Sequence, residues 1–127
     1  MNPDLEHCIK QFDKAREKGV INSHIEIYAV NKLDNKEDIL AFYTEYVEFM
    51  QDFINYEIDA GKESSATKLV DKGYDLEQVA EFFVHDGLMF TLGHIFNQNI
   101  LKIWYDTLPH MNSDYFDSMY KSSNIFS

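Results

Sequence analysis

Three side chains in the second half of the chain have the types and spacing for metal or acid–base chemistry. Glu81 and His85 are four residues apart, so a helix would place them on one face, and His94 follows in the same apolar segment. Carboxylates and imidazoles are common ligands of transition metals. One candidate function is therefore a ligand-binding or metal-binding helical bundle, including an enzyme that uses Glu81, His85 and His94.

These residues do not complete a known motif. Di-iron helical bundles use a Glu-x-x-His pair, whereas Glu81 and His85 have one more residue between them. His85 and His94 would point to opposite sides of a continuous helix, where each would be an ordinary hydrogen-bonded or half-exposed histidine. We therefore assign no catalytic residue and no metal site, and we expect no bound cofactor.

The cysteine usage and the remaining motifs also point away from catalysis. Cys8 is the one cysteine, and it falls on an apolar stripe with Leu5 and Phe12, where a thiol acts as a small hydrophobic side chain. No internal disulfide can form, which is typical of a reducing cytoplasm. The sequence has no phosphate-binding loop, nucleophile elbow or zinc-spaced Cys/His set. We expect a protein that is not an enzyme.

The negative charge is concentrated in one segment. Residues Glu37 to Gly61 include seven carboxylates and no Lys or Arg, in a chain whose formal net charge is -11. On a helical wheel four of these acids share the side opposite the apolar residues. These four residues, here called the acidic face, are Glu45, Glu48, Asp52 and Asp59.

The acidic face has two interpretations. It is a solvated surface, or it binds a basic partner. Like charges three or four residues apart on a helix cost about 0.2–0.5 kcal/mol per pair, and no basic residue within the segment offsets this repulsion. We therefore predict a small acidic interaction protein that binds a basic surface of another macromolecule, as an inhibitor, an immunity protein or an anti-defence factor would. A nucleic-acid-binding protein is one partner of this kind.

Neutralisation inside the molecule is the alternative for this face. Two groups of lysines could dock on it, one after the segment and one on the first helix: Lys62, Lys68 and Lys72, or Lys10, Lys14 and Lys18. The sequence leaves this choice open.

The overall composition excludes several partners. A pI near 4.7 argues against direct binding to nucleic-acid phosphates or to an anionic membrane, because both require clustered Lys and Arg. No apolar run approaches the roughly 20 residues of a membrane-spanning helix. The start of the chain lacks the pattern of a signal peptide, so we expect a cytoplasmic protein.

Helix signals run through the first half of the chain. Asn2-Pro3 begins a helix that ends at Lys18-Gly19, and Asp34-Asn35 begins a long amphipathic helix that ends near Gly61. Ser64 or Ser65 begins a short helix that ends at Lys72-Gly73. Residues 20–33 fit both a strand and a helix, and the capping box Ser23-His24-Ile25-Glu26, in which the glutamate reaches back to the N-cap, favours the helix.

The second half is more apolar. From Leu76 to about Tyr105 apolar residues cover most of the circumference of a helix. This pattern predicts one long central helix (about 76–105) that buries Leu88 and Phe90. The acidic helix is expected to pack against its side. Residues 112–121 fit a last short helix, and about 122–127 should be frayed. The chain is thus predicted to be a single all-α domain (1–127), a compact bundle of five or six helices. Apolar surface in excess of one bundle would suit a homo-oligomer interface.

Overall fold

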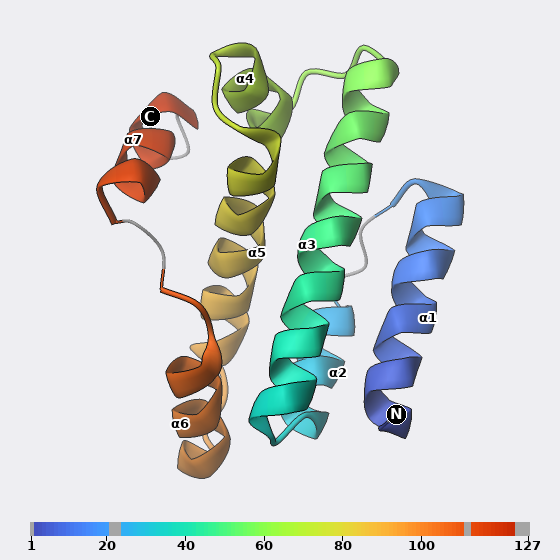
Figure 1. The fold of residues 1–127 in the computed structure, drawn as a ribbon, viewed down its shortest axis with the longest axis vertical. Helices are drawn as coiled ribbons and strands as arrows, with labels where there is room; N and C mark the ends of the chain where they lie inside the picture. Colours follow the sequence, from blue (N-terminus) through green and yellow to red (C-terminus); the bar gives the residue numbers. More distant parts are fainter. Residues whose placement is uncertain (1, 21–23, 111–112, 124–127) are drawn as a thin grey trace.

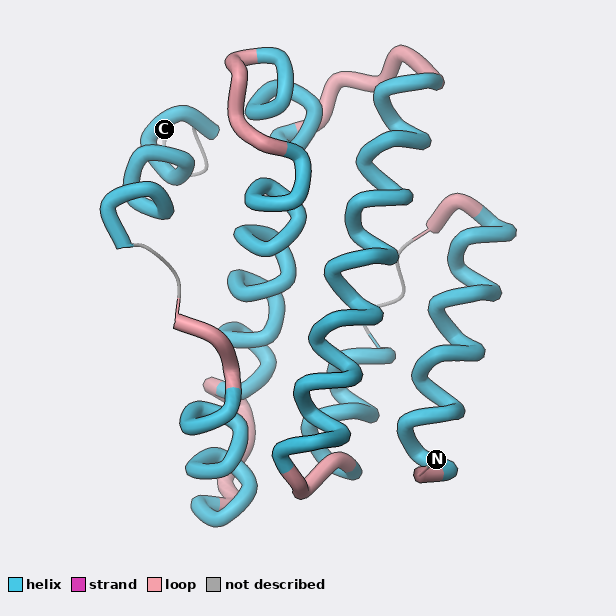
Figure 2. The backbone as a smooth tube through the Cα atoms, viewed as in Figure 1, coloured by secondary structure: helices cyan, strands magenta, loops and turns pink. Residues whose placement is uncertain are grey.

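The computed structural model describes residues 2–20, 24–110 and 113–123, and these residues form seven helices and no strand (Figures 1 and 2). The predicted all-α class is confirmed, with seven helices where five or six were expected. They are α1 (Pro3–Lys18), α2 (His24–Lys32), α3 (Lys36–Asp59), α4 (Ser65–Asp71), α5 (Leu76–Leu92), α6 (Gln98–Thr107) and α7 (Ser113–Ser123).

The long helix α3 is the centre of the bundle. It runs between α1 and α5, and it also packs against α4 and α6 (Figure 1). α2 fills the space behind α3 and contacts α1 and α5, whereas α7 lies outside α5 next to α4. The prediction placed the segment 76–105 in the middle with the acidic helix beside it, whereas in the structure α3 and α5 pack against each other and share the middle of the bundle.

The prediction of one continuous helix over 76–105 is wrong. Helix α5 ends at Leu92, and α6 begins again after Asn97. The side-chain oxygen of Asn97 accepts hydrogen bonds from the backbone N–H groups of Asn99 (3.0 Å) and Ile100 (3.2 Å). An asparagine that caps a helix in this way competes with helical continuation, so the apolar run is divided into two shorter helices.

The other predicted helix boundaries agree closely with the structure. The Asn2 side chain caps α1, and Gly19 ends it with a φ of 66°, a left-handed conformation that favours glycine. Ser64 and Thr67 form a capping box at the start of α4. The ambiguous segment 20–33 contains helix α2, so the helical alternative is confirmed, although Ser23 of its predicted capping box lies outside the described residues.

Aromatic side chains join the helices in the core. Phe12 of α1 stacks on Phe42 and Phe49 of α3 with ring centroids 5.6 and 5.1 Å apart. Trp104 of α6 is fully buried, and its indole N–H donates a hydrogen bond of 2.9 Å to the Leu33 carbonyl after α2. Cys8 is also fully buried, and burial raises the pKa of its thiol to about 11, as expected of a packing residue. In the described part of the chain, no helix is both long and apolar enough to cross a membrane.

Candidate functional site

The acidic face lies on the solvent-facing side of α3, beside α1. Glu48, Asp52 and Asp59 are exposed and Glu45 is half-buried. Within the described residues no ion pair involves Glu45, Glu48 or Asp59. Three of the four predicted residues therefore lack an ion-pair partner in the described part of the chain. Of the lysines after α3, Lys62 lies over the ring of Tyr56, with its Nζ atom 5.6 Å from the centroid.

The fourth residue, Asp52, is neutralised from α1, but not by a lysine. Its carboxylate accepts a hydrogen bond of 3.0 Å from Nε of Arg16, which also pairs with Asp13 at 2.9 Å. The Arg16 guanidinium lies over the ring of Phe49, 5.6 Å from its centroid. Of the lysines on α1, Lys10 forms its ion pair with Glu6. Sequence reasoning missed Arg16 because the residue sits at the edge of the α1 polar side, and only packing on α3 brings it to Asp52.

A hollow of about 220 Å³ adjoins the acidic face. Phe53 and Tyr56 of α3 form an aromatic wall, Arg16 and Asp52 form a polar one, and Gly19 closes the end next to α1. Tyr56 is 51% exposed. The C-terminal half of α3 thus combines an aromatic depression with carboxylates that have no ion-pair partner among the described residues.

A buried carboxylate that sequence reasoning did not single out lies between α2, α3 and α5. Glu26 is only 8% exposed, and its carboxylate accepts hydrogen bonds from the hydroxyl of Tyr46 and from Thr91 Oγ1 at 3.0 Å. The capping box assigned this side chain to the N-terminus of its own helix, and the structure directs it into the core instead. The signal available in the sequence was the position of Glu26 between Ile25 and Ile27, and short apolar runs of this kind are ambiguous.

No positive charge accompanies Glu26 among these contacts, so burial controls its ionisation. Desolvation raises the pKa of Glu26 above its ordinary value, the hydrogen bonds from Tyr46 and Thr91 oppose the rise, and Asp86 adds to it. A carboxyl group whose pKa is higher in the folded state favours folding below its unfolded pKa. This stability is lost as the pH rises through the folded value.

The free energies of unfolding of the Glu26→Gln variant and the wild type should therefore diverge as the pH rises. Glutamine keeps the shape and both hydrogen-bonding positions but cannot ionise. The variant's free energy of unfolding, relative to wild type, should be constant below about pH 4.5, the ordinary glutamate pKa, and should increase at higher pH. Urea denaturation between pH 4 and pH 8 measures this difference. A difference that does not change with pH would show that Glu26 has the same pKa in the folded and unfolded states.

The candidate metal ligands do not form one site. Glu81 and His85 share the face of α5 near Tyr43, whereas His94 lies beyond the end of α5, exposed, with Nδ1 2.9 Å from the Phe90 carbonyl. Within the described ranges, no group of three or more His, Cys, Asp or Glu residues is arranged to hold a metal ion. His85 borders a cavity of about 350 Å³ that Glu81 and His94 do not line.

His85 is a polar residue of α5 that the structure buries. Its side chain lies edge-on to Tyr43 and to Phe116, with ring centroids 5.3 and 5.8 Å apart, and the residue is 5% exposed. Its Nε2 atom and the Tyr43 hydroxyl are both buried without a hydrogen-bond partner among the described residues. Buried polar atoms are rarely unpaired, so this corner of the molecule calls for a functional explanation.

Comparison of the chain with protein-family models, with curated proteins and with solved structures found no match.

Proposed function

We propose that this protein is an interaction protein that binds a basic protein surface through the acidic face on α3. The main support is the set of carboxylates on one side of α3, of which Glu45, Glu48 and Asp59 have no ion-pair partner among the described residues. A partner rich in Lys and Arg would be attracted to this side over a distance comparable to the Debye length, about 8 Å at physiological salt.

The contact between Arg16 and α3 supports this mode of binding. Its guanidinium pairs with Asp52 and covers the ring of Phe49, so α3 already binds an arginine through a carboxylate and an aromatic ring together. Arginine favours sites of this composition because its planar group forms directional hydrogen bonds and stacks on rings. A partner arginine would pair with Glu48 or Asp59 as Arg16 pairs with Asp52.

The hollow beside Tyr56 supplies the second element of an interface. Charge pairs at an interface rim contribute mainly to association rate and specificity, whereas affinity depends on a few anchors that fill pockets. The hollow has aromatic walls and lies beside the acidic face. We infer that the partner inserts one side chain there and surrounds it with Lys or Arg residues.

The test neutralises the acids that have no ion-pair partner in the described part of the chain. In the triple variant Glu45→Gln, Glu48→Gln, Asp59→Asn the fold should be retained, because the three side chains form no ion pair in the described structure. The partner should be captured from a lysate of the native host by the wild type, less efficiently as salt is added, and not by the variant. Quantitative mass spectrometry of the captured proteins measures this, and the partner should carry a basic surface.

A matched control variant distinguishes the effect of losing the acidic face from the effect of a lower net charge. The triple variant Glu63→Gln, Asp71→Asn, Asp117→Asn changes the net charge equally, from -11 to -8, at exposed positions outside α3. It should capture the partner as the wild type does. Equal capture by all three proteins would contradict the proposal and leave the acidic face as a solvated surface.

A further inference from the structure

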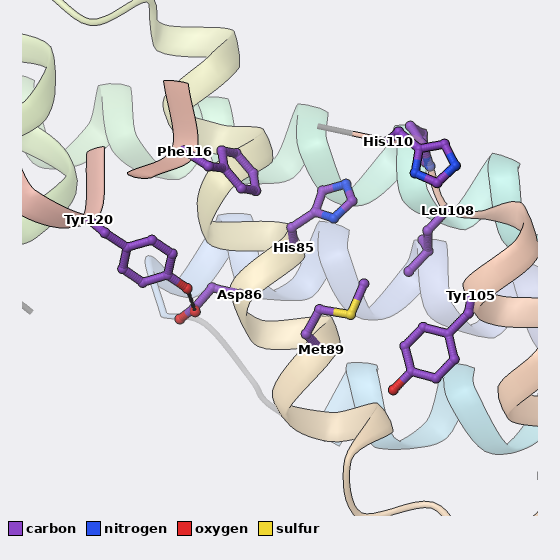
Figure 3. Close-up of a pocket in the computed structure, with 9 residues that line it drawn as sticks. His85, Asp86, Met89, Tyr105, Leu108, His110, Phe116 and Tyr120 are labelled. Carbon is purple, nitrogen blue, oxygen red and sulfur yellow. Dashed lines mark hydrogen bonds between the residues drawn. The ribbon is translucent and has the colours of Figure 1, made fainter. Parts of the chain in front are cut away.

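A cavity of about 350 Å³ lies on the side of α5 away from the acidic face, between α5, the end of α6 and α7 (Figure 3). Its walls are mostly apolar or aromatic: Met89 of α5, Tyr105 of α6, Leu108 just after α6, and Phe116 and Tyr120 of α7. The volume is within the range of small-molecule sites, which are typically lined by apolar side chains with a few polar groups.

Two polar side chains occupy the wall that α5 contributes. Asp86 is exposed and accepts a hydrogen bond of 2.5 Å from the Tyr120 hydroxyl, so it is already paired. His85 is buried, with its imidazole between Phe116 and His110 in Figure 3, and its Nε2 atom has no partner among the described residues. The neighbouring Tyr43 hydroxyl likewise has no partner within the described ranges. Of the three buried side-chain polar atoms without a hydrogen-bond partner among the described residues, two therefore lie at His85 and its neighbour Tyr43, and the third is Thr107 Oγ1 at the end of α6.

The surroundings of His85 restrict the charge of a ligand. Burial lowers the pKa of His85, so the imidazole is neutral near pH 7 and offers no positive charge to an anion. Asp86 at the same wall and the net charge of -11 repel anions further. A neutral imidazole has one nitrogen that donates and one that accepts. A ligand hydroxyl can do either, so it suits both tautomers of His85.

We propose that this cavity binds a small, uncharged aromatic molecule whose hydroxyl group forms a hydrogen bond with His85. The ring would lie against Met89, Tyr105 and Phe116, where aromatic and sulfur contacts favour it. This site is separate from the acidic face and does not depend on the proposed partner.

Phenol and toluene form a matched pair of probes, because a methyl group replaces the hydroxyl with little change of shape. Each is titrated into the full-length protein, and NMR follows the Met89 methyl signal and the ring nitrogens of His85. Phenol should shift both signals in a saturable manner. Toluene should bind about tenfold more weakly, the ratio expected for one hydrogen bond, and should leave the His85 nitrogens unchanged.

Two variants test whether the difference between phenol and toluene binding depends on His85. His85→Phe should reduce phenol binding to the level of toluene, whereas His94→Phe, which replaces an exposed histidine outside the cavity, should keep the difference between the probes. Equal affinities of the two probes for the wild type, or the absence of saturable Met89 shifts with phenol, would overturn the proposal. Because the wild-type comparison needs no substitution, this result stands even where the His85→Phe protein does not fold.

Discussion

The Leu88→Asp variant should be unfolded at 25 °C, whereas Phe90→Asp, only two positions away, should stay folded. Leu88 is fully buried on α5, and a carboxylate without a partner at that position costs several kcal/mol, against a total stability of about 5–15 kcal/mol for a typical domain. Phe90 is 73% exposed near the end of α5, so its replacement should lower the free energy of unfolding by about 1 kcal/mol or less.

Circular dichroism and urea denaturation of the two purified variants check this contrast. The result matters because the sequence places both residues on one buried helix, so Phe90→Asp was expected to unfold the protein as well. An unfolded Phe90→Asp protein would mean that the end of α5 is covered in solution. Phe96, in the loop that follows α5, is 93% exposed. A surface that covers the end of α5 should therefore be sought around Phe90 and Phe96.

The sequence predicted helices well wherever a capping residue stood next to an amphipathic pattern. Asn2, Asn35 and Ser64 each act as an N-cap in the structure, because a short polar side chain before an apolar run satisfies backbone N–H groups that the helix leaves free. The same rule applied to Asn97 would have divided the segment 76–105. The uninterrupted apolar pattern concealed this cap, because the pattern does not distinguish one long helix from two that pack on the same neighbour.

The site residues were predictable only as far as they depend on one helix. Glu45, Glu48, Asp52 and Asp59 share a side of α3 because helical periodicity requires it. The partner of Asp52 is 36 residues away, and Arg16 reaches it through the packing of α1 on α3. Likewise, Glu26 meets Tyr46 and Thr91 from two other helices. Contacts between elements depend on the tertiary arrangement, which periodicity and capping do not specify.

The Gly87→Ala variant should be less stable than the wild type by about 1–3 kcal/mol, although alanine is the better helix former by about 1 kcal/mol. A Cβ atom at Gly87 would lie 2.8 Å from Glu26 Oε1 and 3.1 Å from Oε2, closer than normal contact. A free side chain would move away, but Tyr46 and Thr91 hold this carboxylate by hydrogen bonds. The absence of a side chain at Gly87 thus makes room for the buried acid.

A double-mutant cycle distinguishes this steric explanation from one based on charge. In the Glu26→Gln background the amide occupies the same space, so Gly87→Ala should remain destabilising by a similar amount. In the Glu26→Ala background the obstructing atoms are gone, so the same substitution should be neutral or should stabilise by up to about 1 kcal/mol through helix propensity. Urea denaturation of the six proteins gives both coupling energies. If Gly87→Ala stabilises all three backgrounds equally, the carboxylate is free to move and Glu26 does not hold α2 to α5.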